Sequence, residues 1–500
     1  MIWTTARRRC RQPFLIATVL VLVAALYTGT MLIHVHRPAR YVIQPTLSTP
    51  YLPFDMPSGG TTKKVFAHYV PWVTISIDNQ PYQRDYYTTQ LSTPHGEGGV
   101  HAAYGGVIRD RPLPRDPIND PNWRNIDLCT EITQAKSVGI DGFAVDALVP
   151  ASQSDAVSRV MDAAQTVGEF SIQVTPDMTG AFGSNYDEAA FAAEFAPYLR
   201  HAAAQRLTDG RVVFGAFYAE RKPATWWQNV LNILRDTYQL NVAFVPTFLD
   251  ALPNLSAFAP FSYGLSNWGT RNPSVVSPTD TAEGSPVDLV RRAKALGKLW
   301  MQPVAFQDNR PRSGVFEESQ NAVTNRNGWQ IAISQQAEWV NLITWNDYAE
   351  MTAVAPSVKH GWRILDMDAY QIARYKFGVD PPILRDAVYV SHRMQPHAAH
   401  PTFPETLLMR NIAPTPARDA VEVEAYSRAP SMVVAVIGGS LQTCNVPAGF
   451  GVCTFGLAPG GITVRLYRSN VDQVVVQSPY QVTNTPYVQD LQYVVAGGLR

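Results

Sequence analysis

Two carboxylic acids, Asp347 and Glu350, follow an apolar run in the segment Trp345-Asn-Asp-Tyr-Ala-Glu350. A buried strand has no use for such side chains, because an unpaired carboxylate is costly to bury. At the mouth of a barrel, in contrast, two such acids can act on a bound substrate. Cleavage of a glycosidic bond takes one acid for the leaving oxygen and one base or nucleophile for the anomeric centre. The spacing therefore predicts Asp347 and Glu350 as the catalytic residues of a glycosidase.

The neighbours Trp345, Asn346 and Tyr348 fit the same interpretation. Aromatic rings present flat faces that suit the apolar faces of sugars, so we expect Trp345 and Tyr348 to bind substrate. We expect the same of Asn346, a polar residue at the end of the strand. The alternative is that Asp347 caps the chain that follows and Glu350 is a solvated acid. A Trp-Asn pair ahead of them has no capping purpose, which favours the catalytic interpretation.

Short apolar runs of strand type recur through the middle of the chain, from residue 64 onward. Helical patterns separate most of them, and this alternation predicts a parallel sheet. Eight such units indicate an α/β fold, a (β/α)8 TIM barrel over residues 64–382, with the segment 78–120 as a long loop over its mouth. The predicted strands are Val65–Val70, Gly142–Leu148, Phe170–Met178, Val212–Tyr218, Val242–Leu249, Tyr263–Trp268, Leu299–Phe306 and Val340–Trp345. The predicted helices are Trp123–Val138, Ser154–Val167, Tyr186–Ala204, Ala224–Tyr238, Pro286–Leu296, Glu317–Gln336 and Leu365–Tyr375.

Polar residues gather where these strands end, and active sites of this fold lie at those ends. Each has an alternative: Asp146 and Asp177 as helix caps, His68 as a satisfied core histidine, Glu220 as an exposed ion pair with Arg221 or Lys222. The predicted substrate-binding residues are His68, Asp146, Asp177, Glu220, Trp268 and Gln302.

Residues 383–500 contain strand-like segments separated by Gly/Pro turns, with no helical pattern between them. This predicts an all-β sandwich as a C-terminal accessory domain. Cys444 and Cys453 flank a predicted hairpin tip and are expected to form a disulfide, which suits an exported protein.

The N-terminal sequence is typical of a targeting segment. Four arginines between Arg7 and Arg11 precede Phe14–Ile33, a run of 20 residues without a charge. That length suffices to span a bilayer, and the basic flank should stay cytoplasmic. We expect residues 1–36 to be a cytoplasmic basic segment and signal anchor and 37–63 to be a linker. The protein would then be exported and membrane-anchored at the cell surface, or secreted if the segment is cleaved.

Composition excludes several other classes of function. The net charge is zero, which gives no reason to expect a nucleic-acid partner. The histidines are scattered rather than spaced as metal ligands, and no nucleophile elbow or phosphate-binding loop appears. We therefore expect no metal and no cofactor, a polysaccharide as the partner, and a monomer.

The chain resembles glycoside hydrolase family 71, the mutanase-type endo-α-1,3-glucanases, from about residue 64 to 500. Three motifs carry the resemblance in the same order: Val65-Phe-Ala-His-Tyr69, Gly139-Ile-Asp-Gly-Phe-Ala-Val-Asp146 and Thr344-Trp-Asn-Asp-Tyr-Ala-Glu350. The resemblance implies a catalytic barrel with a C-terminal β-domain and hydrolysis with inversion. It also implies that Asp347 and Glu350 are the catalytic pair, and we expect Glu350 to be the acid and Asp347 to activate water.

Two loops depart from the family pattern, Val70-Pro71-Trp72 and Ala305–Pro311, and both are expected to line sugar subsites. Two other hypotheses therefore stay open. One is an endo-α-mannosidase-like or other α-glycan hydrolase, because family 99 has a similar Trp-Asn-Glu-x-x-Glu end to its last strand; Asp347 in place of that first Glu argues against it. The other is a non-catalytic glycan-binding surface protein, against which the presence of both acids argues.

Overall fold

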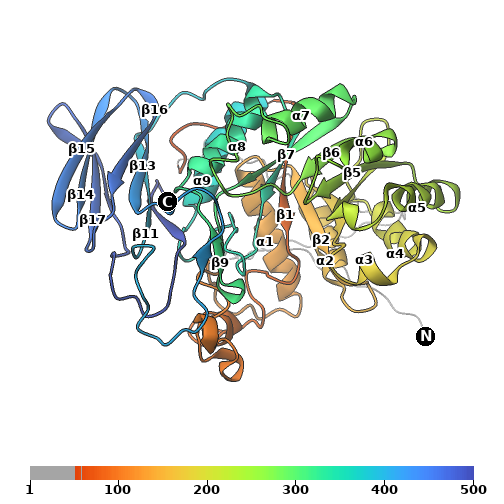
Figure 1. Cartoon of the computed structure of the whole chain (residues 1–500), viewed down its shortest axis with the longest axis horizontal. Helices are drawn as coiled ribbons and strands as arrows, with labels where there is room; N and C mark the ends of the chain where they lie inside the picture. The colour runs from red at the N-terminus through yellow and green to blue at the C-terminus, as the bar shows by residue number, and fades with distance from the viewer. Residues whose placement is uncertain (1–50, 58) are drawn as a thin grey trace, which may run out of the picture.

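The computed structural model describes residues 51–57 and 59–500, and it shows a helix-wrapped barrel beside an all-β domain (Figure 1). The predicted signal anchor lies outside these residues. Among the helices that are described, none combines the length and the apolar character needed to cross a bilayer.

Eight parallel strands close into the predicted barrel, in the order β1-β10-β7-β6-β5-β4-β3-β2. Each predicted strand is present within a few residues of its expected ends. The strands are β1 Lys64–Tyr69, β2 Gly142–Ala147, β3 Ser171–Pro176, β4 Val212–Phe217, β5 Val242–Phe248, β6 Gly264–Asn267, β7 Leu299–Ala305 and β10 Trp339–Ile343.

Side chains alternate between the interior of the barrel and its helical coat, because successive residues of a strand point to opposite faces. Phe66, Val213, Val245 and Met301 meet inside the barrel in one apolar cluster. Residues one position away, such as Ala67, belong to the larger core between strands and helices. This alternation decides which strand residues reach the mouth.

The helices of the coat are those that the sequence predicts, with shifted ends. The helix predicted from Glu317 begins only at Val323, because Val315–Glu317 forms β9, which pairs with β8, Asp308–Arg310. The helix predicted from Tyr186 begins after Asp187, whose carboxylate accepts a hydrogen bond from the backbone N–H of Ala190 and so caps it. The helices of the coat are α1 Trp123–Ser137, α2 Ala156–Val167, α4 Glu188–Arg200, α5 Ala224–Asp236, α7 Pro286–Ala295, α8 Val323–Ser334 and α9 Arg363–Phe377.

Two segments differ from the simple domain plan. Residues 51–56 were expected to be linker, yet Leu52 and Phe54 are buried, and Phe54 packs edge-on against Tyr370 with ring centroids 5.4 Å apart. The segment 78–120 forms short helical turns and is tied down: the Arg109 guanidinium donates to the Gln489 carbonyl of the C-terminal region at 2.7 Å. Both segments thus belong to the packed body of the protein.

The C-terminal domain is the predicted β-sandwich, with two four-stranded sheets in the orders β16-β13-β11-β19 and β15-β14-β17-β18. Cys444 and Cys453 form a disulfide between β15 and β16. These consecutive strands lie in different sheets, so the disulfide joins the two layers at a corner, where a hairpin was expected. The strands are β11 Ala387–Arg393, β13 Ala420–Ser427, β14 Ser431–Ile437, β15 Ser440–Val446, β16 Gly449–Gly456, β17 Ile462–Arg468, β18 Val471–Gln477 and β19 Tyr493–Gly497.

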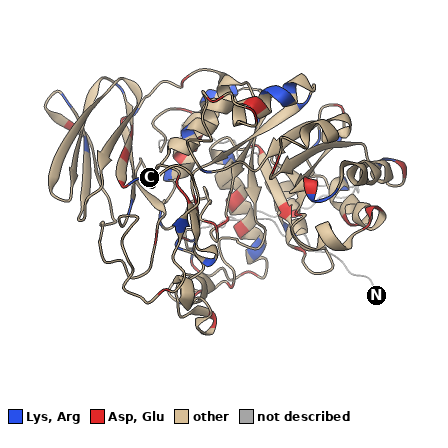
Figure 2. Cartoon of the chain, viewed as in Figure 1, with Lys and Arg blue, Asp and Glu red and all other residues tan. Residues whose placement is uncertain are grey.

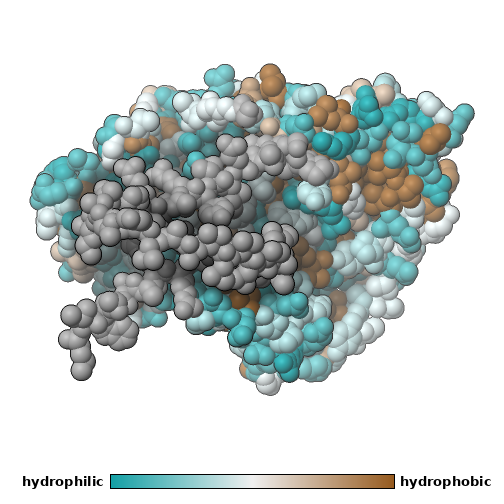
Figure 3. All heavy atoms as spheres, turned by 180° about the vertical axis from the view of Figure 1, so that it is seen from behind, coloured by the Kyte–Doolittle hydropathy of each residue, from teal (hydrophilic) through white to brown (hydrophobic). Residues whose placement is uncertain are grey.

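Charge and apolar surface are distributed differently over the molecule. Over the described residues, Lys and Arg are interspersed with Asp and Glu (Figure 2). Apolar side chains gather over the sheet β15-β14-β17-β18 of the sandwich (Figure 3, right), where Leu441 and Val475 are exposed.

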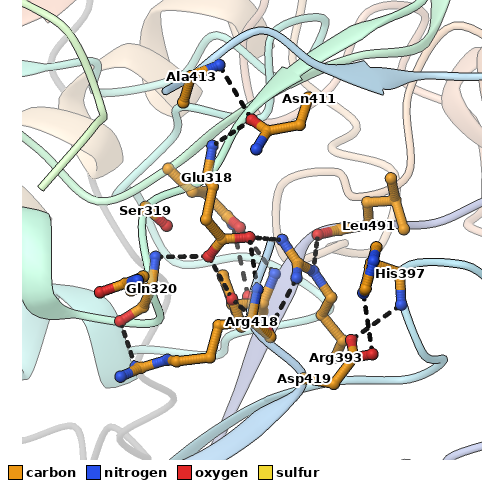
Figure 4. Close-up of polar contacts among 12 residues, drawn as sticks. Glu318, Ser319, Gln320, Arg393, His397, Asn411, Ala413, Arg418, Asp419 and Leu491 are labelled. Carbon is orange, nitrogen blue, oxygen red and sulfur yellow. Dashed lines mark hydrogen bonds and ion pairs between the residues drawn. The ribbon is translucent and has the colours of Figure 1, made fainter. Parts of the chain in front are cut away.

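Buried ion pairs join the sandwich to the barrel. Glu318, between β9 and α8, accepts hydrogen bonds from Arg393 at 2.8 Å and from the Tyr493 hydroxyl at 2.6 Å (Figure 4). Arg326 of α8 contacts Glu422 at 2.7 Å and Glu424 at 2.6 Å, both on β13. We call these residues, with Arg418, the junction cluster.

Candidate active site

Strand β10 ends at Ile343, the Ile343–Thr344 peptide bond is cis, and the following chain folds back on itself at the barrel mouth. The Thr344 hydroxyl accepts from the Asp347 N–H at 2.8 Å, and the Val354 N–H donates to the Thr344 carbonyl at 3.0 Å. This closed loop carries Asp347 and Glu350, both of which remain partly exposed.

Asp347 also caps the chain, as the alternative interpretation expects. Its Oδ1 accepts from the backbone N–H groups of Ala349 and Glu350, each at 3.0 Å. Within the described residues, Oδ2 accepts no hydrogen bond. One oxygen therefore fixes the carboxylate while the other is free for chemistry.

Glu350 contacts a cation that comes from β8. Its Oε1 lies 2.8 Å from Nη1 of Arg310, and the other edge of that guanidinium binds Asp308 at 2.7 and 2.6 Å. Arg271 lies behind Asp308, with its Nε 3.8 Å from the carboxylate. We call Asp308, Asp347, Glu350, Arg271 and Arg310 the mouth cluster.

The electrostatics of the mouth cluster favour a protonated Glu350. Burial is the largest cause, and the negative charges of Asp347 and Asp308 add to it, raising the pKa of Glu350 to about 8, although Arg310 and Arg271 oppose the shift. The pKa of Asp347 is raised too, chiefly by burial. A carboxyl that holds its proton at neutral pH is suited to general acid catalysis.

Three other predicted residues meet inside the barrel mouth. Nε2 of His68 lies 3.7 Å from Oδ2 of Asp146, and the other carboxylate oxygen of Asp146 is buried without a hydrogen-bond partner. The His68 ring packs edge-on against Trp268, with centroids 4.8 Å apart. Phe217, which the sequence analysis did not select, completes this wall 4.6 Å from Trp268.

Asp177 lies beside this group, and its structure supports both interpretations. Its Oδ1 accepts from the Thr179 N–H at 2.7 Å, which is a turn-capping contact. Burial, and then the neighbouring Asp146, raise its pKa. Asp177 therefore both closes a turn and adds a second carboxyl to the His68–Asp146 pair.

Glu220 holds a loop of the mouth. Its Oε1 accepts from the backbone N–H groups of Leu249 at 2.8 Å and Asp250 at 2.7 Å, just after β5. These partners replace the ion pair with Arg221 or Lys222 that was the alternative. Its Oε2 is buried and has no hydrogen-bond partner among the described residues, and burial raises the pKa of the carboxyl.

Gln302 is placed away from the barrel interior, contrary to the prediction of a mouth residue. It alternates with Met301, which is in the interior cluster, and its amide oxygen accepts from the Trp300 indole N–H at 2.9 Å. It lines a cavity of about 220 Å³ that also touches Trp268 and helices α7 and α8. A direct role at the anomeric centre does not fit this position.

Trp345, Asn346 and Tyr348 also differ from expectation, because all three are buried. Trp345 packs outward against Phe143, with ring centroids 5.2 Å apart. Tyr348 joins an apolar cluster with Tyr87, under the segment 78–120. These side chains build the mouth rather than line it.

Asn346 pins the loop that follows β1. Its Oδ1 accepts from the Val70 N–H at 2.8 Å, and its Nδ2 donates to the carbonyls of Val70 and Val73. Trp72 lies in the turn between those two anchored residues and is 46 % exposed. The residue before Asp347 thus fixes a turn that carries an exposed indole.

Arg310 and Arg271 are residues of the mouth that sequence reasoning missed. The sequence Gln307-Asp308-Asn309-Arg310 directly after strand seven, an acid two residues from a base, was the available signal. Nothing local to it indicates that Arg310 contacts Glu350, 40 positions later, because the β8–β9 excursion brings them together.

A closed (β/α)8 barrel with two carboxyl groups after its last strand is an architecture that suits a glycoside hydrolase. A model of glycosyl hydrolase family 71 matches residues 118–496, and the chain belongs to that family.

Three proteins of known name are similar in sequence. Glucan endo-1,3-alpha-glucosidase agn1 of Schizosaccharomyces pombe is 24% identical over 57% of this chain and 69% of its own. The ascus wall endo-1,3-alpha-glucanase of the same yeast is 24% identical over 47% of this chain and 55% of its own. Mutanase Pc12g07500 of Penicillium rubens is 22% identical over 86% and 89%.

Among solved structures, a GH99 endo-alpha-mannosidase from Bacteroides thetaiotaomicron is similar, with a TM-score of 0.45 and 15% identity. The match covers 63% of this chain and 96% of that one.

Proposed function

We propose that this glycoside hydrolase cleaves α-1,3-glucan with inversion, using Glu350 as the general acid and Asp347 as the base that activates water. The observation that carries the proposal is that one loop places Asp347 and Glu350 together at the mouth of a barrel of family 71. The raised pKa of Glu350 supports it. The three named relatives support the choice of substrate, because each carries the name of an α-1,3-glucanase or mutanase.

The proposed reaction uses the two acids in different states. Glu350 gives its proton to the leaving glycosidic oxygen. Asp347, held at Oδ1 by two backbone amides, takes a proton through Oδ2 from the water that attacks the anomeric carbon on the opposite side. In inverting enzymes the two carboxyl groups stand about 6.5–9.5 Å apart, which leaves room for that water.

The remaining mouth residues are proposed to hold the sugar. His68 and Asp146 offer a polar pair inside the barrel, Asp177 lies beside them, and Trp268 offers an apolar wall. The unpartnered Oδ1 of Asp146 is free to accept from a sugar hydroxyl. Glu220 is proposed to act through the loop after β5, and Gln302, Trp345, Asn346 and Tyr348 through the shape of the mouth.

A substrate panel tests the proposal. Residues 51–500 are incubated with α-1,3-glucan, other α-glucans, α-mannan and arabinogalactan-type polymers, and the products are sized. We expect the greatest turnover on α-1,3-glucan. NMR of the first product should show the β-anomer. Greater turnover on α-mannan, or an initial α-anomer, would contradict the proposal, and activity on no polymer would favour a glycan-binding role.

Export and anchoring are also proposed, on the arginine cluster and the uncharged run within residues 1–36, and a monomeric state is proposed with them. Cells that express the full chain should retain it in the membrane fraction, with residues 64–500 accessible to added protease. A processed enzyme in the medium would show that the segment is a cleaved signal.

A further inference from the structure

Arg310 divides its guanidinium between two carboxylates of the mouth cluster. Nε and Nη2 face Asp308, and Nη1 faces Glu350. A two-point pair with Asp308 fixes the plane of the guanidinium, because the donors of Arg match the oxygens of a carboxylate. Asp308 is almost fully buried, so this anchor is shielded from water. The position of Nη1, and with it that of Glu350 Oε1, follows from the anchor.

The backbone of β8 holds Glu350 from the same side. The N–H of Asn309, between Asp308 and Arg310, donates to the Glu350 carbonyl at 2.8 Å. Strand β8 is itself fixed by antiparallel pairing with β9, which also pairs with β12, Arg410–Asn411. Both the main chain and the side chain of Glu350 are therefore positioned by one short strand.

We propose that Arg310, anchored by Asp308, is a positioning residue that aims the Glu350 carboxyl at the leaving oxygen and balances its charge after proton donation. The proposal deepens the proposed function and rests on Glu350 as the acid. It extends the reaction to a loop after strand seven that departs from the family pattern.

Four charged groups face Glu350: Asp347 from its own loop, Asp308 and Arg310 from β8, and Arg271 from the loop after β6. The two acids favour the protonated carboxyl and the two arginines favour the ionised one. Removing Arg310 should therefore raise the pKa of Glu350, whereas neutralising Asp308 should lower it. The two substitutions should therefore shift the pKa of Glu350 in opposite directions. A general loss of structure would not produce opposite shifts.

The test compares pH profiles of kcat/KM on α-1,3-glucan for R310M, R310K and D308N. Arg312→Met, an exposed arginine two residues along, is the matched control. In R310M we expect kcat to fall about 100-fold, as misplacement of a reacting group costs. The alkaline limb should move up by about one pH unit or more, as loss of an opposite charge allows. R310K should keep the limb near that of the wild type, because the charge remains. D308N should move the limb down.

The ionisation of Glu350 is followed independently of turnover by NMR on protein labelled at the glutamate carboxyl carbon. The signal is assigned by its loss in E350Q. The same opposite shifts in R310M and D308N support the proposal even if no polymer is cleaved. In that case the proposed function fails, while the control of the Glu350 ionisation by Arg310 and Asp308 stands. An unchanged profile and titration in R310M, or shifts of R310M and D308N in the same direction, would overturn it.

Discussion

The junction cluster and the mouth cluster both bring carboxylates against arginines, but the contacts of each carboxylate differ between the two regions. At the junction, Glu318 accepts four hydrogen bonds, from Arg393, the Tyr493 hydroxyl and the backbone N–H groups of Gln320 and Arg418. At the mouth, the Glu350 carboxylate has an ion pair with Arg310, and no hydrogen bond to it is found among the described residues. Glu318 has no exposed surface, whereas the Glu350 side chain is 28% exposed.

The comparison separates a structural from a chemical use of the same groups. A buried carboxylate whose oxygens all accept hydrogen bonds is held in one position, and breaking such a set is costly. A carboxyl with few donors, among other acids, keeps its proton to a higher pH and can pass it on. The number of donors around each oxygen therefore predicts what a substitution will change, activity or stability.

The largest effect is expected from the mouth acids. Asp347→Asn and Glu350→Gln should each lower kcat by about 100- to 10,000-fold, because each removes one partner of general acid–base catalysis. The unfolding transition should stay near that of the wild type. Turnover of α-1,3-glucan and thermal unfolding are the measurements. A variant that keeps a third of the activity would remove that residue from the catalytic pair.

At the junction the effect should fall on stability. Glu318→Ala leaves Arg393 buried without its counter-charge, which costs about 3–5 kcal/mol of unfolding free energy. Chemical unfolding of the whole chain measures it. The control is Asp236→Ala, whose partner Arg235 is exposed, and which should leave stability close to that of the wild type. Equal effects of the two substitutions would contradict a stabilising role of the buried ion pair at the junction.

Glu131 of α1 is a third environment, a buried carboxyl that accepts from the Tyr69 hydroxyl. Burial is the main cause that raises its pKa from 4.5 to about 8. The folded protein then binds the proton more tightly than the unfolded chain, so stability falls as pH rises between those values, by up to about 1.4 kcal/mol per unit. Glu131→Gln should flatten this decline. Thermal unfolding from pH 5 to 8 measures it, and an unchanged slope would contradict it.

The smallest effect is expected at the rim. Trp72→Ala should raise KM for α-1,3-glucan several-fold, since stacking of an aromatic ring is worth about 1 kcal/mol, with kcat little changed. Trp72→Phe should keep part of the affinity. Initial rates are measured on polymer and on a short oligosaccharide. A subsite at the rim should matter only for the polymer, so KM should rise for the polymer and not for the oligosaccharide. A fall in kcat instead would place Trp72 nearer the acids.

Much of this protein could be predicted from the sequence, because its barrel is built from local patterns. Each strand is a short apolar run bounded by polar residues, so all eight were found. Asp347 and Glu350 were found for a related reason: acids directly after such a run cannot belong to the buried strand. The pairing of Cys444 with Cys453 needed only two cysteines close in sequence.

The direction of a side chain and its distant partners were decided by the tertiary structure. Gln302 points to the helices because the register of β7 places Met301 inside the barrel. Tyr348 is buried because the loop after β10 folds back under the segment 78–120. Trp345 is buried because it packs against Phe143 in the core between strands and helices. Arg310 reaches Glu350 only because β8 pairs with β9 above the mouth. Sequence periodicity determined where the acids lie, and long-range packing determined which charges surround them and therefore how they titrate.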